Sequence, residues 1–243
     1  MDTLEAGLLK LGLYSQKTIA LLKKYIAEIE LFNPAYGLVK VKDREELIVR
    51  HILDSLAPID LIVRQINCIP GITGCAPGVS DEKRQIPPAK IADLGTGAGL
   101  PGIPLAIFMP QGSFTLVERM GRRAGFLRNT LALLSLPNVV IEESEAERIA
   151  LTNAGNFNAI IFRAFKPLEV ALLKRLQRLL SPGGFLAAYK GRRQSIDDEL
   201  ERLWAEDSKL HELLRCECMS LEVPFLKEER HLLILSVPPT TPP

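Results

Sequence analysis

Length, composition and charge limit what this chain can be. It has 243 residues, of which 47% are hydrophobic and 24% are charged, and its formal net charge is +1. That composition excludes an intrinsically disordered chain and fits one main folded domain. Because the net charge is close to zero, a nucleic-acid partner would have to be held by a local basic patch and not by the field of the whole protein.

The sequence lacks the features of a membrane or secreted protein. It contains no run of about 18 uninterrupted apolar residues. Its first residues, MDTLEAGLLKLGLYSQK, include acidic side chains where a signal peptide carries basic ones. The cysteines have neither a CxxC spacing nor a zinc-ligand spacing; they are Cys68, Cys75, Cys216 and Cys218. We therefore expect a cytoplasmic protein that binds no membrane and no metal.

The first quarter of the chain has a helical pattern. Apolar residues recur at helical spacing over residues 16–33 and again over residues 44–64. We expect a helical extension over residues 1–65. Residues 66–88 combine proline, glycine and polar residues without a period, which is typical of a loop or a surface insertion.

From Lys90 onward the sequence has an α/β pattern. Short apolar runs (IADLG, FTLVE, VVIEE, NAIIFR and FLAAYKG) alternate with segments of helical period such as 121–136 and 168–180. This alternation predicts a doubly wound, mostly parallel sheet over residues 89–237. Two later strands, near 214–223 and 230–237, are too close for a crossover helix, so we expect them to pair antiparallel at one edge. The tail, 238–243, is predicted to be disordered.

A glycine-rich motif carries the strongest local signal. It runs from Ile91 to Gly102 with the sequence IADLGTGAGLPG, and predicts a strand, a tight turn and a helix. Glycines in such a turn let the backbone approach a ligand closely and point amides of the following helix toward it. Glu118 ends the next predicted strand, where a carboxylate can accept hydrogen bonds from both hydroxyls of an adenosine ribose. Together these features predict a cofactor that contains adenosine.

The details of the motif favour S-adenosylmethionine over NAD. A dinucleotide fingerprint needs glycine where Leu100 stands, and a pyrophosphate-binding helix does not usually carry Pro101 and Pro104. S-Adenosylmethionine has no pyrophosphate and presents a carboxylate, a sulfonium cation and a ribose. Asp93, directly before the glycines, can hold its positively charged methionine part, either directly or through water.

Six separated segments stand out, in this order: VRHILDS (49–55), DLGTGAGLPGIPLAI (93–107), FTLVERMGRRAGFLRN (114–129), Arg163-Ala164-Phe165, Tyr189-Lys190-Gly191 and Glu229-Arg230-His231-Leu232. In the same order, these segments resemble the bacterial small-subunit (16S) ribosomal RNA guanine-N7 methyltransferases, also called the glucose-inhibited division protein B family. The resemblance implies a class I, Rossmann-like methyltransferase fold with N-terminal helices. It also implies methylation of guanine N7 in small-subunit ribosomal RNA.

The resemblance further implies a set of cofactor-binding residues. Carried over onto matching positions, the contacts to S-adenosylmethionine fall on Gly95, Leu100, Ala146, Glu147 and Arg163. Glu118 is the expected ribose partner. We name no catalytic acid or base, because guanine N7 already offers a lone pair in the neutral base. The expected partner is small-subunit ribosomal RNA or a ribosomal particle, and we expect a monomer.

Some positions depart from the family pattern, in which a Trp-Asn pair is followed by a second Asn and a Thr. Here the corresponding residues are Phe32, Asn33, Gly37 and Val39. Gly37 puts one local polar contact in doubt. The segment 66–88 is also longer than the family pattern, and we assign it no role.

Several residues are candidates for contact with RNA. Arg163 and Phe165 follow the fourth predicted strand, although Phe165 can equally be a core residue. Basic clusters can neutralise phosphates, but a run of charges is more often a solvated face; the clusters are Arg119, Arg122, Arg123 and Arg128, then Lys190, Arg192 and Arg193, then Lys40, Lys42, Arg44 and Arg50. Position at a strand end favours Lys190 and Arg192. We interpret His51 as a packing residue at helical spacing from Asp54 and Ser55.

Two other functions stay open. A methyltransferase for a small molecule or a protein can use the same fold, and so can a nucleotide-sensing protein without catalysis. A flat, basic surface beside the cofactor would favour RNA, whereas a closed apolar pocket there would favour a small substrate.

Overall fold

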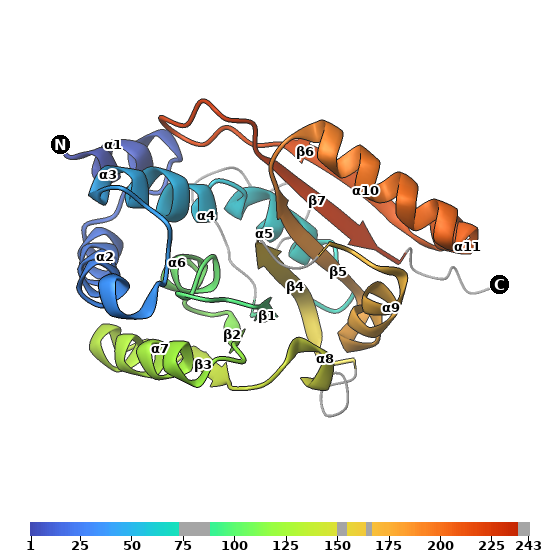
Figure 1. Ribbon diagram of the computed structural model, residues 1–243, viewed down its shortest axis with the longest axis horizontal. Coiled ribbons are helices and arrows are strands. Elements are labelled where there is room, and N and C mark those ends of the chain that lie inside the picture. The colour runs from blue at the N-terminus through green and yellow to red at the C-terminus, as the bar shows by residue number, and fades with distance from the viewer. Residues whose placement is uncertain (73–87, 150–154, 164–166, 238–243) are drawn as a thin grey trace.

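A computed structural model describes residues 1–72, 88–149, 155–163 and 167–237 of the chain (Figure 1). These residues form one seven-stranded sheet with the strand order β3-β2-β1-β4-β5-β7-β6. The strands are β1 (Lys90–Leu94), β2 (Ser113–Val117), β3 (Val139–Glu142), β4 (Phe157–Arg163), β5 (Leu180–Lys190), β6 (Arg215–Ser220) and β7 (His231–Ser236). Strands β1 to β5 are parallel, and β7 runs antiparallel to β5 and to the edge strand β6. This confirms the predicted α/β fold and its antiparallel edge.

Helices cover both faces of the sheet (Figure 1). One face carries α1 (Thr3–Lys10), α2 (Gln16–Tyr36), α3 (Arg44–Leu47), the π-helix η1 (Ile48–Leu53), α4 (Asp54–Leu56), α5 (Ile59–Asn67), α6 (Gly102–Phe108) and α7 (Gly121–Leu134). The other face carries α8 (Ala146–Ile149), α9 (Val170–Leu179), α10 (Arg193–Glu206) and α11 (Ser208–Leu213). The result is a three-layer α/β/α arrangement.

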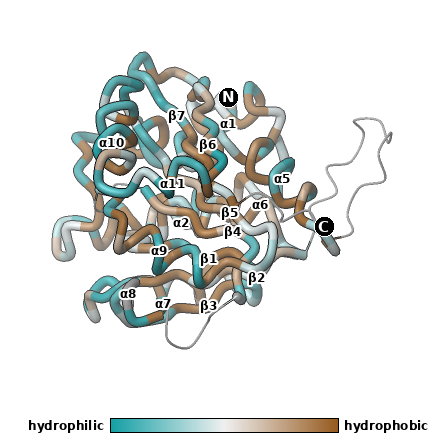
Figure 2. The backbone as a smooth tube through the Cα atoms, turned by 90° about the vertical axis from the view of Figure 1, so that its right-hand side faces the viewer, coloured by the Kyte–Doolittle hydropathy of each residue, from teal (hydrophilic) through white to brown (hydrophobic). Residues whose placement is uncertain are grey.

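Alternate residues of each central strand enter the two layers. In β4, Ala159 and Ile161 join the core beneath α1–α7, whereas Ile160 and Phe162 join the core beneath α8–α11. Side chains in a strand point alternately to its two faces, so a strand covered on both faces has a continuous apolar run. Figure 2 shows these strands in hydrophobic colours at the centre of the molecule and α10 in mainly hydrophilic colours outside.

The N-terminal helices share their core with the sheet. Leu22 and Ile26 of α2 pack in the same apolar cluster as Leu105 of α6 and Leu127 of α7. A buried hydroxyl adds a polar link, since Tyr25 donates a hydrogen bond to the carbonyl oxygen of Ala98 in the glycine turn at 2.8 Å. The helices therefore support that turn directly, while the division of the chain at residue 65 stays a prediction.

The second predicted N-terminal helix is not one regular helix. Residues 44–56 run from α3 through the π-helical segment η1 into α4, and the chain turns at Ala57 and Pro58 before α5. Proline lacks the N–H that would continue the hydrogen-bond ladder, so it marks the boundary. Hydrophobic periodicity shows that a helix exists but does not distinguish a π-helical segment, which is typical of functional sites.

Gly37 has a clear structural role. It ends α2 in the left-handed conformation, with a φ of 58°, and its N–H donates to the carbonyl oxygen of Asn33 at 2.9 Å. The Asn33 side chain then accepts a hydrogen bond from the N–H of Val39 at 2.9 Å. Glycine and asparagine are the residues most tolerant of this conformation. Glycine in place of the family's second asparagine therefore preserves the helix end.

Some predictions fall on residues that the structure does not describe. These are the tail 238–243, Phe165, and residues 73–87 of the predicted insertion. Across the described residues, every helix is too short or too polar to cross a lipid bilayer.

Candidate functional site

The candidate site lies at the edge of the sheet where the parallel strands end. In open α/β sheets this carboxyl edge is where ligands bind. Asp93 of β1, Arg163 of β4 and Tyr189 of β5 lie at this edge, and their strand positions alternate with residues that enter the α8–α11 core. All three side chains therefore point toward the layer of N-terminal helices.

The glycine turn follows β1 as predicted. Gly95, Gly97 and Gly99 have φ values of 65°, 60° and 96°, which strain any residue with a side chain. A Cβ atom added at Gly99 would lie 2.4 Å from the Cδ1 atom of Ile103, whereas one at Gly97 would meet only the Gly95 carbonyl oxygen, at 3.9 Å. The turn is packed against α6 on one side and leaves the backbone of Gly97 approachable from the other.

Asp93 holds the turn together from below. Its carboxylate is fully buried, and one oxygen, Oδ2, accepts hydrogen bonds from the Thr96 hydroxyl at 2.6 Å and from the Gly102 N–H at 2.8 Å. Burial raises the pKa of Asp93 to about 6. The other oxygen, Oδ1, is buried without a hydrogen-bond partner in the described part of the chain. Asp93 is therefore a support of the turn that retains one unsatisfied acceptor.

Glu118 lies directly after β2, and its side chain folds over the turn. Its Oε2 atom accepts a hydrogen bond from the Gly97 N–H at 3.0 Å, and its Oε1 atom accepts one from the Met120 N–H at 2.9 Å. Each carboxylate oxygen has two acceptor positions, so both oxygens retain capacity for a ligand hydroxyl. The structure thus brings Glu118 and the glycine turn together as the sequence predicted.

The remaining predicted cofactor residues surround the same edge. Leu100 is buried at the end of the turn, and its N–H donates to the carbonyl oxygen of Thr96 at 3.0 Å. Ala146 and Glu147 form the start of α8, after β3.

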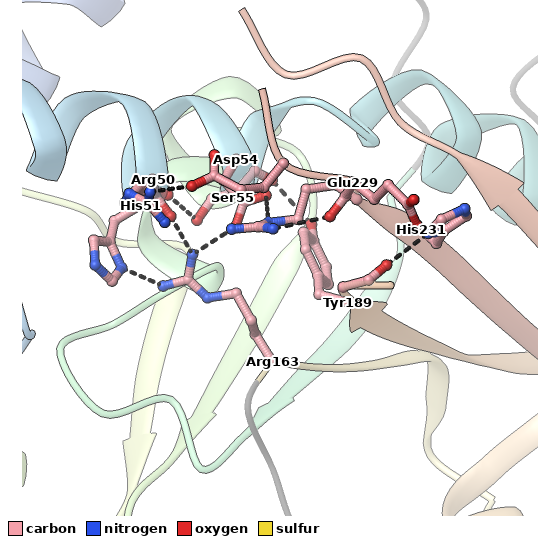
Figure 3. A network of polar contacts seen from close by, with 11 residues as sticks. Arg50, His51, Asp54, Ser55, Arg163, Tyr189, Glu229 and His231 are labelled. Atoms are coloured by element: carbon pink, nitrogen blue, oxygen red, sulfur yellow. Dashed lines mark hydrogen bonds and ion pairs between the residues drawn. The ribbon is translucent and has the colours of Figure 1, made fainter. Parts of the chain in front are cut away.

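Arg163 reaches from the end of β4 to the π-helix η1 (Figure 3). Its Nη1 atom donates to the Asp54 carboxylate at 3.1 Å and to the Arg50 carbonyl oxygen at 3.4 Å. Its Nη2 atom lies 3.0 Å from Nδ1 of His51. Burial raises the pKa of Asp93, and the charge of Arg163 opposes part of that rise, so the guanidinium links this network electrostatically to the glycine turn.

His51 is a satisfied, neutral histidine, but its partner differs from the expected ones. Burial, followed by the charge of Arg163, lowers its pKa to about 4. The neutral ring can therefore accept from Arg163 through Nδ1, and it also forms a hydrogen bond with the backbone of Lys40. Sequence spacing pointed to Asp54 and Ser55, whereas the contact with Arg163 is long-range.

Asp54 lies between two arginines. Its carboxylate is almost completely buried, with Oδ2 facing Arg163 and Oδ1 lying 3.2 Å from Nε of Arg230. Burial raises the pKa of Asp54, and the two guanidinium groups oppose that shift. Nearby, the Tyr189 hydroxyl donates to the carbonyl oxygen of Ser55 at 2.9 Å. These groups border a pocket of about 420 Å³, lined by Arg50, His51, Asp54, Arg163, Tyr189, Lys190, Gly191, Leu221, Arg230 and His231.

Comparison with known proteins assigns the family. The model described as rRNA small subunit methyltransferase G matches residues 18–79 and 72–233. A protein named ribosomal RNA small subunit methyltransferase G from Treponema denticola is 38% identical over 244 residues, which cover 96% of this chain and 92% of the relative. The chain belongs to this family. A relative of the same name from Cellvibrio japonicus is 36% identical and covers 87% of the chain, with 83% of its own length matched.

Solved structures support the fold of the family. A putative O-methyltransferase from Klebsiella pneumoniae superposes with a TM-score of 0.55 at 17% identity, covering 92% of this chain and 90% of that protein. A SAM-dependent methyltransferase from Aquifex aeolicus superposes with a TM-score of 0.52 at 16% identity, covering 87% and 98%. At these identities the likeness shows the class I methyltransferase fold alone.

The structure divides the predicted basic residues of this family member into two groups. Several already have carboxylate partners: Lys190 with Glu199 at 2.6 Å, Arg193 with Asp197 at 2.9 Å, Arg128 with Glu143 at 2.6 Å, Arg44 with Glu30, and Arg50 with Glu46 and Glu228. In the described part of the chain, exposed Arg119, Arg122 and Arg192 have no ion pair. The prediction that favoured Lys190 as a free phosphate ligand overlooked Glu199, which α10 brings to it.

Proposed function

We propose that this chain transfers the methyl group of S-adenosylmethionine to N7 of a guanine in small-subunit ribosomal RNA. The family assignment supports this function. The observation that carries it is the meeting, at one edge of the sheet, of a glycine turn covered by Glu118 and a pocket lined by cations. The first suits an adenosine-containing methyl donor, and the second suits a polyanionic acceptor.

The residues at the glycine turn fit S-adenosylmethionine. Glu118 has acceptor capacity for the ribose hydroxyls, and the backbone at Gly97 is open to a ligand. The unsatisfied oxygen of Asp93 lies beneath the same turn. The residues that would hold the cofactor are Gly95, Leu100, Glu118, Ala146, Glu147 and Arg163.

The reaction requires the protein to align the methyl donor and acceptor, but it does not require proton transfer. The bound cofactor supplies a methyl group on a sulfonium sulfur. Guanine N7 carries a free lone pair in the neutral base, so no residue has to remove a proton. The chain contributes by holding nucleophile and donor in line, an effect that reaches roughly 7–11 kcal/mol in the best cases. At this edge of the sheet, Arg163 contacts both Asp54 and neutral His51.

The acceptor guanine must be accessible from its major-groove edge. In an RNA helix N7 lies in the deep, narrow major groove, so the target has to be unpaired or extruded. In this proposal the guanine belongs to small-subunit ribosomal RNA, either naked or in a ribosomal particle, and the protein acts in the cytoplasm as a monomer.

A small-molecule acceptor has less support. The described residues do enclose a larger cavity of about 730 Å³ with a mainly apolar lining that includes Leu13, Ile59, Phe108 and Leu134. That cavity, however, is bordered by the C-terminal ends of α6 and α7, which lead into the starts of β2 and β3. It therefore lies at the opposite edge of the sheet from the glycine turn.

Mass mapping of ribosomal RNA tests the proposal. RNA from cells that lack this protein is incubated with purified protein and S-adenosylmethionine. Every nucleotide whose mass increases by one methyl group is then located. Reduction with borohydride and aniline cleavage then distinguishes N7-methylguanine from other methylguanines. We expect one new site in the small-subunit RNA. Methylation confined to large-subunit RNA, or at another atom of guanine, would contradict the proposal.

A further inference from the structure

The pocket beside Arg163 contains more positive than negative charge. Four cations line it, Arg50, Arg163, Lys190 and Arg230, and Asp54 is the single carboxylate among its lining residues. Lys190 is neutralised by Glu199, and Arg50 by Glu46 and Glu228. Arg163 and Arg230 share Asp54, which is their only carboxylate partner in the described part of the chain. Within this group of three, two guanidinium groups therefore share one carboxylate, whereas Arg50 has two carboxylate partners, so the wider cluster holds equal numbers of cations and carboxylates.

The two guanidinium groups that share Asp54 are largely shielded from solvent. The side chains of Arg163 and Arg230 are only 15% and 22% exposed. A charge withdrawn from water is costly unless an opposite charge compensates it. His51 does not compensate, because it is neutral and accepts a hydrogen bond from Arg163. An anion in the pocket would give Arg163 and Arg230 a second negative partner beside Asp54.

The two guanidinium groups retain donors for such an anion. Each arginine has five N–H donors. Arg163 uses three of them, for Arg50, Asp54 and His51. Arg230 uses one, for the carbonyl oxygen of Glu229, and its Nε atom also lies 3.2 Å from Asp54 as an ion pair. Figure 3 shows the Arg163 guanidinium in contact with Asp54 and with the π-helix η1. Forked donors of this kind match a phosphate group.

We infer that this pocket binds a phosphodiester of the RNA strand next to the acceptor guanosine, with Arg230 as its main ligand and Asp54 as the residue that positions both arginines. The inference rests on the proposed function, which names RNA as the source of the phosphate. Arg163 lines the pocket and ends β4 at the same edge of the sheet as the glycine turn after β1, so a phosphate held here would fix the acceptor nucleotide relative to the cofactor. A free nucleotide could supply the same group, so the experiment has to separate the two sources.

The first measurement needs only the wild-type protein. Guanosine 5′-monophosphate and guanosine are titrated separately by calorimetry at low salt. Hydrogen bonds to a charged group change affinity by about tenfold to a hundredfold, so the monophosphate should bind more tightly by such a factor. Equal affinity for the two compounds would overturn the inference.

Variants of Arg230 then locate the phosphate. Arg230→Gln should lose about tenfold to a hundredfold in affinity for the monophosphate, and Arg230→Lys should recover part of it because the charge remains without the fork. The matched control is Arg215→Gln, since Arg215 is exposed and paired with Glu217 at 2.7 Å. Affinity for S-adenosylmethionine should stay unchanged in all three variants.

If Arg230→Gln does not fold, Arg230→Lys still decides the question. A folded lysine variant with unchanged affinity for both guanosine and its monophosphate would overturn the role of Arg230.

Competition between RNA and guanosine 5′-monophosphate identifies which of the two supplies the phosphate. A short single-stranded RNA with one guanosine should displace the monophosphate, and the same RNA with a neutral methylphosphonate linkage beside that guanosine should displace it less. If neither RNA competes while the monophosphate binds, the pocket is a site for free nucleotides and the RNA inference is wrong. Failure of the proposed function would differ, because ribosomal RNA would then gain no methyl group while competition by RNA persisted.

Discussion

The glycine turn and the cation-lined pocket lie at the same edge of the sheet but are built in different ways. The turn comes from one continuous segment, Ile91–Gly102, and from Glu118 of the next strand, and its contacts are mostly between backbone groups and two carboxylates. The pocket brings together Asp54, Arg163 and Arg230 from distant parts of the chain, and its contacts are between side chains. A site formed by the backbone of one short segment therefore lies beside a site formed by side chains from distant parts of the chain.

The difference shows how each half can fail. The backbone conformation of the glycine turn is set by residues that are close in sequence. A substitution there should therefore affect mainly the binding of the cofactor. In the pocket, a change in one side chain leaves a buried charge without its partner. Breaking such a pair is strongly destabilising, although the intact pair adds little net stability. The structure of the pocket therefore depends on ion pairs between side chains, whereas that of the turn depends on the backbone conformation of its glycines.

The largest expected effect contrasts one buried titratable group from each half. Asp93, under the turn, has its pKa raised to about 6 from an ordinary 3.8, and His51, at the pocket, has its pKa lowered to about 4 from 6.5. Each difference corresponds to about 3 kcal/mol at most. The raised Asp93 pKa contributes stability below pH 4 that is lost as pH rises through 6. The lowered His51 pKa contributes stability above pH 6.5 that is lost as pH falls through 4.

Because the two contributions oppose each other between pH 4 and 6, single variants should separate them. Relative to wild type, His51→Gln should gain stability as the pH falls from 6.5 to 4, and Asp93→Asn should lose it over the same window. Urea unfolding at half-unit pH steps measures both. Exposed His211→Gln and Asp198→Asn are the controls. A wild-type-like pH profile in either buried variant would show that its group has an ordinary pKa.

Glu118 tests whether the turn acts as a cofactor site. Glu118→Gln keeps the size of the side chain and removes its charge, so we expect S-adenosylmethionine affinity to fall by about 1.5–3 kcal/mol, or roughly tenfold to a hundredfold. The affinity for guanosine 5′-monophosphate should not change, because Glu118 does not line the pocket. Calorimetry with both ligands is the measurement. Glu142→Gln, at the end of the neighbouring strand β3 and exposed, is the matched control. Unchanged cofactor affinity would remove Glu118 from the site.

Gly102 tests how tightly the turn is packed. An added Cβ atom would lie 2.3 Å from a methyl carbon of Leu116 and 2.7 Å from the Asp93 carboxylate. Gly102→Ala should therefore destabilise the protein by about 1–3 kcal/mol. Gly125→Ala is the control, since this helical glycine has open space around it and the change should stabilise the protein by about 0.5–1 kcal/mol. Equal unfolding free energies for the two variants would contradict the packing described for the turn.

The same contrast explains what the sequence could predict. The five parallel strands, the antiparallel edge and the position of Glu118 were predictable because alternating patterns and a continuous motif are local signals. The partners of Arg163 were not, because β4 meets η1 only through the tertiary fold. The ion pair between Lys190 and Glu199 was missed for a different reason: the two residues are close in the chain, but the pair depends on how α10 is oriented against the end of β5, which the pattern of residues does not show. Tyr25 left a readable hint, because a hydroxyl among apolar helix positions needs a buried partner.

The smallest expected effect concerns the salt dependence of RNA binding, and it separates free cations from paired ones. Exposed Arg192 has no ion pair in the part of the chain that the structure describes, whereas Lys190, two residues earlier, is paired with buried Glu199. If Arg192 contacts a phosphate, Arg192→Ala should flatten the slope of log affinity against log salt by about 0.7–0.9. Lys190→Met should leave that slope unchanged and instead lower the unfolding free energy, because Glu199 would remain buried without its partner. Both slopes are measured by filter binding of a ribosomal RNA fragment at salt concentrations from about 50 to about 200 mM, a range in which phosphate contacts lose much of their affinity. A flatter slope for Lys190→Met than for Arg192→Ala would reverse the assignment and return Lys190 to the RNA surface.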